Sequence, residues 1–311
     1  MIKADKSLKI AIDSGAHSLY NKYTRGKERS FDFYESDEFW KFVDEYASFI
    51  KEHKDEISLY VSVDVIFNAP LSWKVQKYLE DTHKLNPLPV FHVGEDFKWL
   101  KKYIDNYDYI GLGGLGQTTS KTMWIKGMGD PAFSMICDDK GYPRVKTHGF
   151  AMTSPELIID YPFHSADSSS WVQFGKFGLI IIPKKRNGKF IYDESPHIIS
   201  VSTRKKRKME SENFDHLPPI EKTHVLEYLE MKGFKMGSSD LEIIDFDKTK
   251  PLFPISDKEV SDKEVIVERG VCNDVYIRDA LNLEYYLDLA DNIPPYPRKW
   301  RRKIKTTQFP I

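Results

Sequence analysis

Short apolar runs alternate with amphipathic stretches through the first half of the chain. The runs end in small or acidic residues, as buried strands do, and they span 8–12, 59–65, 89–93, 109–114, 147–152 and 164–168. Between them, apolar residues recur at helical spacing over 37–53, 72–83 and 97–104. Ser154 followed by Pro155 fits one more helix start, with the serine as N-cap. Strands that alternate with helices pair in parallel, which predicts an α/β fold.

This repetition favours a (β/α)8 TIM-like barrel, although the pattern alone separates a barrel from an open sheet poorly. In the second half, strands are predicted over 177–183 and 189–193 around an Asn187-Gly188 turn, and helices over 215–232 and 282–291. The charged, proline-punctuated stretch 245–265 is typical of a surface loop. We expect one irregular barrel domain over residues 1–311. Its catalytic motifs lie within 8–175, a basic insertion within 184–210, and a basic tail within 294–311.

Composition narrows the class of protein. Of the 311 residues, 41% are hydrophobic and 14% aromatic, which is ample for a core and excludes wholesale disorder. Lys and Arg number 46 against 47 Asp and Glu, so a globally basic nucleic-acid coat is excluded while local basic patches are not. Two cysteines exclude a disulfide scaffold and a multi-thiolate zinc site. With no signal-peptide pattern and no long apolar run, we expect a soluble, cytoplasmic protein.

Three aspartates stand at the ends of predicted strands: Asp13, Asp64 and Asp167. In a parallel barrel the strand C-termini carry the chemistry, and a buried carboxylate is costly unless it is paired. Each one alone could equally be a strand-end turn or a helix cap. Because all three would meet at one barrel mouth, we favour a functional site.

The surroundings of Asp167 suit a nucleophile. Small residues flank it, so a large ligand can approach and the carboxylate can attack an electrophilic carbon. With a second carboxylic acid to protonate the leaving group, this is the chemistry of a retaining glycosidase, which needs no metal and no redox cofactor. His17, His92, His148 and His164 also lie near strand ends, in a spacing that favours hydrogen bonding and packing over metal binding.

Gly111 to Gly116 match GxGxxG, but no helix of the required length is predicted to follow, so a dinucleotide loop is not favoured. A strand end whose bare backbone N–H groups contact a planar ligand fits better.

Three motifs, in order, resemble one family. IAIDSGAHSLY, YIGLGGLG and THGFAMTSPELIIDYPFHSADSSSW are similar to segments of the tRNA-guanine transglycosylases, over residue 8 to about residue 175. The Asp-Ser-Ser-Ser-Trp sequence is closer to the divergent phage and bacterial 7-deazaguanine DNA transglycosylases. The resemblance implies a TIM-like barrel that removes guanine from a polynucleotide and inserts a 7-deazaguanine of the preQ0 or preQ1 type. If the chain is phage-encoded, the expected compartment is the host cytoplasm.

The resemblance also implies roles for individual residues. Asp167 would attack C1′ of the sugar, and Asp13 would act as general acid and base. Asp64 would bind the polar edge of the base, where Gly113 and Gly114 offer backbone N–H groups. His92 or Glu95 would replace the family's amide side chain. The remaining base-pocket candidates are Ser14, His148 and Phe67.

Two departures from the family pattern matter. The CxCxxC…His zinc site of the tRNA enzymes is missing, which favours DNA over tRNA as substrate. DSGAHS replaces DSGGFQ, so the phenylalanine that would stack on the base is missing, and Tyr20 or Phe67 could take its place.

Two basic clusters suit contact with a polynucleotide, although charge runs are commonly solvated surface. The residues are Lys184, Lys185, Arg186, Arg204, Lys205, Lys206, Arg207, Trp300, Arg301 and Arg302, with Trp300 as a candidate for stacking on a base. The expected partners are DNA, with a flipped or single-stranded guanine, and the free 7-deazaguanine base. No membrane partner is expected, and a homodimer or helper proteins are left open. The alternatives are a tRNA-guanine transglycosylase, a nucleoside or N-glycosyl hydrolase, and a non-catalytic nucleic-acid-binding partner.

Overall fold

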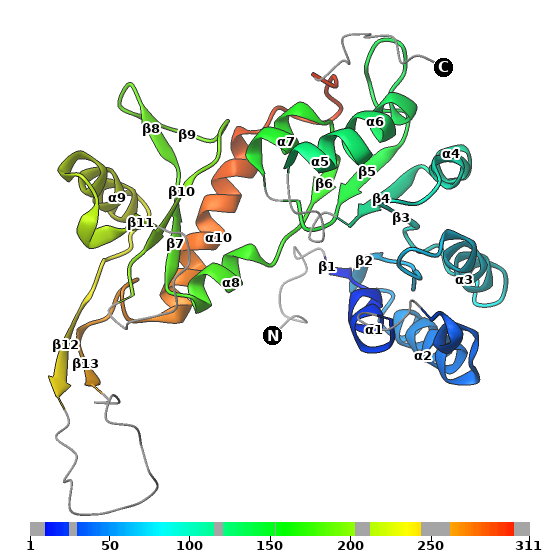
Figure 1. Ribbon diagram of the computed structural model, residues 1–311, viewed down its shortest axis with the longest axis horizontal. Coiled ribbons are helices and arrows are strands. Elements are labelled where there is room, and N and C mark those ends of the chain that lie inside the picture. Colours follow the sequence, from blue (N-terminus) through cyan, green and yellow to red (C-terminus); the bar gives the residue numbers. More distant parts are fainter. Residues whose placement is uncertain are drawn as a thin grey trace, which may run out of the picture. The chain divides into compact units, whose positions relative to one another are not determined.

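The computed structural model describes residues 10–24, 30–114, 121–152, 154–202, 212–243 and 262–301 (Figure 1). Within them the protein has a mixed α/β fold, as the alternation of patterns predicts. The chain divides into two compact units. The first comprises Met1–Thr153, Leu157–Asp167 and Pro294–Ile311, and the second comprises Ser154–Glu156 and Ser168–Ile293. The organisation into one barrel over residues 1–311 stays a prediction.

Parallel strands form the sheet of the first unit. They are β1 (Ile10–Ile12), β2 (Ile57–Tyr60), β3 (Val90–His92), β4 (Tyr109–Gly113), β5 (Lys146–Gly149) and β6 (Ser165–Ala166). Strand β1 pairs with β2, and β3 to β6 pair one after another. A parallel bridge between Val61 and Leu88 joins the two groups. Because every pairing is parallel, the carboxyl ends of all these strands lie along one edge.

Helices make the connections between these strands, as predicted. They are α1 (Ala16–Tyr23), η2 (Asp32–Glu35), α2 (Asp37–Glu52), α3 (Ala69–Asp81), α4 (Phe97–Asn106), α5 (Lys121–Trp124), η4 (Ile125–Gly129), α6 (Asp130–Ile136) and α7 (Pro155–Asp160). Helix α2 shows why they form: the Ser36 side chain accepts a hydrogen bond from the Phe39 N–H, and apolar residues then follow at helical spacing. Its buried face, from Phe39 to Ile50, packs in the core with Val63 and Val65.

The second unit is built around a small antiparallel pair. Strand β7 (Leu179–Ile182) is buried throughout and pairs antiparallel with β10 (His197–Ser200). On its other edge, β10 pairs in parallel with β11 (Glu212–Asn213). The other elements are α8 (Ser170–Lys176), β8 (Lys184–Arg186), β9 (Lys189–Ile191), η5 (Phe214–His216), α9 (Pro219–Met231), β12 (Ser238–Ile243), β13 (Asp262–Glu268) and α10 (Val275–Asn292). Asn282 of α10 accepts from the N–H of Ile181 at 2.8 Å and donates to the carbonyl of Leu179 at 3.2 Å. This buried amide ties the helix to β7.

Several predicted bounds in this half are wrong. The turn at Asn187-Gly188 is present, but the strand before it in the hairpin is β8, which pairs with β9, whereas the apolar strand β7 pairs with β10. Helix α10 begins at Val275, seven residues before the predicted start, where Asp274 caps its first turn. Residues 262–265, expected in a loop, belong to β13, and 244–261 lie outside the described residues.

The segment after α10 returns to the first unit and packs there, up to Arg301. The Arg298 guanidinium donates to the carbonyls of Ile158 at 2.5 Å, of Phe163 at 3.1 Å and of Tyr161 at 3.2 Å. The Trp300 ring is 8% exposed and lies against Tyr161, with ring centroids 6.3 Å apart. The described part of the predicted basic tail is therefore a docked segment, since a buried indole and a bonded guanidinium hold it.

Among the helices that the structure describes, none is long and apolar enough to cross a membrane.

Candidate active site

The three predicted aspartates follow strands of the same parallel sheet. Asp13 comes directly after β1, Asp64 comes shortly after the Val61 bridge, and Asp167 comes directly after β6. Because the strands are parallel, all three stand at the carboxyl edge, where the chemistry of such sheets is usually found. Their environments differ: Asp13 is exposed, Asp64 is buried, and the Asp167 side chain is 59% exposed.

Asp64 belongs to a buried cluster with His92 and Glu95. The Nε2 atom of His92 lies 3.2 Å from Oδ2 of Asp64, and its Nδ1 atom lies 3.9 Å from Oε1 of Glu95. Oε2 of Glu95 accepts the backbone N–H of His92 at 3.0 Å, which fixes one side of this carboxyl group. Oδ2 of Asp64, Nδ1 of His92 and Oε1 of Glu95 have no well-aligned hydrogen bond within the described part of the chain.

Burial sets the charges of this cluster. It raises the pKa of Asp64 well above its usual range, and the neighbouring Glu95 carboxylate raises it further. Burial also raises the pKa of Glu95 to about 7 and lowers the pKa of His92 to about 4. The imidazole is therefore neutral near pH 7, and the two carboxyl groups do not both ionise there.

Asp13 lies close enough to this cluster to act on it electrically. Its negative charge raises the pKa of Asp64 and contributes to the raised pKa of Tyr46, for which burial is the larger cause. The Tyr46 hydroxyl donates to the carbonyl of Val61 at 2.6 Å, just before Asp64. Ser14 is buried and its Oγ accepts the N–H of Ala16 at 3.4 Å, so this predicted pocket residue also shapes the start of α1.

A second group of side chains orients Asp167. The Oδ1 atom of Asp167 accepts the backbone N–H of Ala151 at 3.0 Å and lies 3.5 Å from Nε2 of His148. The other ring nitrogen of His148, Nδ1, lies 2.6 Å from Oγ of Ser165. This Ser165 oxygen in turn lies 2.5 Å from the Tyr109 hydroxyl. Burial alone would raise the pKa of Asp167, but the hydrogen bonds from His148 and Ala151 outweigh it, so this pKa is lowered.

Sequence reasoning missed Tyr109 and Ala151 in this group, whereas the Ser165 hydroxyl is one of those that the sequence itself places beside Asp167. Ala151 acts through its backbone N–H at a positive φ of 54°, for which the residue type gives no signal.

The two predicted glycines, Gly113 and Gly114, also have a structural part. A Cβ at Gly113 would lie 2.8 Å from Cδ2 and 2.9 Å from Nε2 of His92, so the bare backbone makes room for the imidazole. Gly114 has φ of 92° and faces Val93. Contact of their N–H groups with a base stays a prediction.

Phe67 stands out by its backbone. Its φ is 66°, which is unusual for a bulky residue, and its ring meets Tyr20 edge-to-face with centroids 5.7 Å apart. The two aromatic candidates for base stacking are thus neighbours.

Most predicted nucleic-acid contacts in the described ranges are already engaged by the protein. Lys184 and Arg186 both pair with Glu194, at 3.1 Å and 2.6 Å, and Lys185 pairs with Glu227. Trp300 is buried, so its predicted stacking on a base is wrong for this structure. Arg301 is exposed, whereas Arg204, Lys205, Lys206, Arg207 and Arg302 lie outside the described residues.

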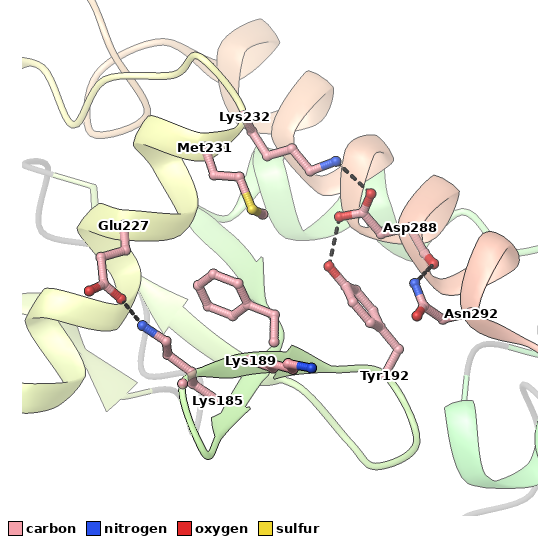
Figure 2. A pocket seen from close by; sticks show the side chains of 10 residues that line it. Lys185, Lys189, Tyr192, Glu227, Met231, Lys232, Asp288 and Asn292 are labelled. Carbon is pink, nitrogen blue, oxygen red and sulfur yellow. Dashed lines mark hydrogen bonds and ion pairs between the residues drawn. The ribbon is translucent and has the colours of Figure 1, made fainter.

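Figure 2 shows the pocket beside the hairpin of β8 and β9. It has a volume of about 630 Å³ and is lined by residues of the second unit alone. In this pocket, Asp288 forms an ion pair with Lys232 at 2.5 Å and accepts a hydrogen bond from the Tyr192 hydroxyl at 2.7 Å. The charge of Asp288 is therefore largely balanced by Lys232. None of the predicted aspartates lines it.

In the described ranges, no group of three or more His, Cys, Asp or Glu side chains is placed to hold a metal ion. That the reaction needs no metal and no cofactor stays a prediction. No protein-family model, no curated protein and no solved structure matches the chain.

Proposed function

We propose that this chain is a transglycosylase that exchanges guanine in DNA for a 7-deazaguanine base, on a TIM-like barrel to which β1–β6 belong. The observation that supports this best is the state of Asp167. Its carboxylate is exposed, its pKa is lowered, and His148 and the Ala151 N–H hold it at the carboxyl edge of the sheet. An ionised, accessible and oriented carboxylate is what a nucleophile at a sugar carbon requires.

In the first step, an oxygen of Asp167 attacks C1′ while the bond from C1′ to the guanine nitrogen breaks. Asp13, exposed at the same edge, gives a proton to the departing guanine. The product is a glycosyl ester of Asp167 and a free base. In the second step the incoming 7-deazaguanine loses a proton to Asp13, its nitrogen attacks C1′, and the ester bond to Asp167 breaks. Both carboxyl groups end as they began, so the exchange needs no co-reactant.

The base pocket in this proposal lies around Asp64. Its buried carboxyl group faces the polar edge of the base, and Phe67 with Tyr20 supplies the aromatic wall. Backbone strain at a bulky residue is commonly kept where function requires it, and the positive φ of Phe67 fits that role.

DNA is proposed as the substrate because the thiolate zinc site of the tRNA enzymes has no counterpart among the two cysteines of the sequence. Of those two, Cys137 is partly buried, and burial raises its pKa to about 12, which makes it a poor thiolate ligand.

The decisive experiment traps the covalent intermediate. The full-length protein is mixed with a guanine-containing oligodeoxynucleotide and labelled guanine, and the products are separated on a denaturing gel. We expect label in the strand and a protein–DNA band in the wild type. Both are lost in Asp167→Asn, which keeps the side-chain shape and removes the nucleophile.

Asp160→Asn, in the last position of α7, is the matched control and should keep the band. A band of equal intensity in both variants would exclude Asp167 as nucleophile. Loss of guanine from the strand without incorporation would identify a hydrolase instead. Labelling of transfer RNA but not of DNA would overturn the choice of substrate.

A further inference from the structure

The His92 imidazole lies between two carboxyl groups, with one ring nitrogen toward each. The side chains of His92, Asp64 and Glu95 are 6%, 6% and 3% exposed, so water has almost no access to them. Each of the three carries a polar atom without an aligned partner in the described residues. Nδ1 of His92 lies toward Oε1 of Glu95, and Oδ2 of Asp64 lies toward the other ring nitrogen, Nε2. Such an arrangement is expensive unless protons are shared within it.

Among the described residues, no cation is found that lowers the pKa of Asp64 or Glu95. The charge of Asp13 raises the pKa of Asp64, and the two carboxylates in turn add to the raised pKa values of Tyr46 and of Tyr103 in α4, for which burial is the larger cause. Burial disfavours the charged form of both carboxyl groups, and the charge of Glu95 adds to this at Asp64, so near neutral pH one of them keeps a proton. The charge of Asp13 also raises the pKa of Asp64, whereas Glu95 accepts a backbone N–H that favours its ionised form, so the proton rests on Asp64.

We propose that Asp64, His92 and Glu95 form a buried proton relay in which His92 passes one proton between the two carboxyl groups. The inference rests on the proposed function, because it gives Asp64 two charge states in the base pocket. When the relay operates, the O–H bond of Asp64 breaks as Nε2–H forms on His92. At the same time Nδ1–H breaks as O–H forms on Glu95. The imidazole stays neutral throughout, and no proton enters from water.

The geometry requires only small movements for this transfer. The Asp64 contact is already 3.2 Å, and the 3.9 Å gap to Glu95 must close by about 1 Å to reach hydrogen-bond distance. Gly113 leaves the imidazole the room it needs, since any side chain there would touch Cδ2 and Nε2.

The consequence for the base pocket is that the Asp64 carboxyl group can switch reversibly between donating and accepting a hydrogen bond. As a carboxylic acid, Asp64 donates a hydrogen bond to a carbonyl or ring nitrogen of a base; as a carboxylate, it accepts from N–H groups. Glu95 does not touch the base, so it is a positioning residue that sets the charge of Asp64 through His92.

The test reads the His92 tautomer directly, on the full-length protein without substrate. Histidine is labelled with ¹⁵N, and the His92 signals are identified by their loss in His92→Gln. In the wild type we expect a neutral imidazole from about pH 5 to about pH 8, whose proton moves toward Nδ1 as Glu95 ionises near pH 7. Glu95→Gln should abolish this pH-dependent change, because the amide does not titrate.

Glu80→Gln is the matched control, since Glu80 is also shielded by protein, at 17% exposed, and bonds to Lys77 of its own helix α3 and to Tyr107. It should leave the His92 signals as in the wild type. A protonated His92 near pH 6, or the same tautomer change in Glu95→Gln as in the wild type, would overturn the relay.

Exchange kinetics separate this proposal from the proposed function. If the chain exchanges bases, Glu95→Gln should shift the pH profile of kcat while leaving KM within about threefold. An altered tautomer in a protein that exchanges no base would leave the relay standing and refute the transglycosylase. If the protein exchanges bases but Glu95→Gln leaves the His92 tautomer change as in the wild type, the transglycosylase stands and the relay is refuted.

Discussion

Asp167 and Asp64 are two carboxyl groups at one sheet edge whose surroundings push their pKa values in opposite directions. Asp167 is exposed and receives hydrogen bonds, while Asp64 is buried beside a second carboxyl group. This separation is how sites assign different acid–base tasks to the same residue type. The sequence indicates that both stand at strand ends. Their charges could not be predicted from it, because burial and the His148 and Glu95 contacts come from residues distant along the chain.

The stability of the protein should respond to the raised pKa of Glu95. A group whose pKa is about 7 in the fold and lower in the unfolded chain stabilises the fold fully at acidic pH, and this stabilisation is lost as the pH rises through 7. Relative to Glu95→Gln, the wild type should therefore lose about 2 kcal/mol between about pH 5 and about pH 8. Urea unfolding at several pH values measures the difference, and a gap that stays constant with pH would contradict it.

At the scale of single elements, local patterns predicted most of the first unit. The helix expected over 37–53 is α2, and each of the six apolar runs overlaps a strand, because the periodicity of apolar residues is set within each element. The strand pairings of the second unit were not predictable in the same way. Strand β7 takes β10 as its partner rather than β9, the strand after the Asn187-Gly188 turn that was predicted to pair with it.

The close approach of β4 to β3 predicts the effect of adding one methyl group. In Gly113→Ala the new Cβ would meet the His92 ring at 2.8 Å, so the imidazole or the strand must move. We expect a loss of about 1–3 kcal/mol of stability, as is usual for an overfilled core, together with a changed His92 spectrum.

Gly127→Ala provides the comparison, since a Cβ there meets nothing within 4 Å. It should be neutral or stabilising by under about 1 kcal/mol, because alanine favours helices more than glycine. Equal losses in the two variants, measured by urea unfolding, would show that the approach to His92 is not the cause.

At the scale of the whole molecule, the chain leaves the first unit after Asp167 and rejoins it at Pro294. Composition and charge indicated a basic tail there, because Arg and Lys dominate its sequence. The structure instead uses Arg298 as a partly buried donor to the carbonyls at the end of α7. A partner that is distant in sequence decides whether such residues are solvated or docked, so local pattern could not settle it.

Removing the Arg298 guanidinium should weaken the packing of the segment after Pro294 against the end of α7. Arg298→Met keeps the apolar stem but leaves the carbonyls of Ile158, Tyr161 and Phe163 without their donor, at a cost of about 2–4 kcal/mol. Hydrogen exchange of the α7 amides should accelerate accordingly. Arg301→Met removes an exposed side chain whose backbone N–H still bonds Asp160, so faster exchange there too would argue against a role specific to Arg298.

The return of Arg298 and Trp300 also orders events during synthesis of the protein. Asp167 leaves the ribosome roughly 130 residues before Arg301, an interval on the order of ten seconds at ordinary elongation rates. Throughout that interval the strands that carry the aspartates have emerged, while the side chains that cover Tyr161 have not. The first unit is therefore the first to begin folding and the last to be completed, and a nascent chain halted before residue 294 should expose Tyr161.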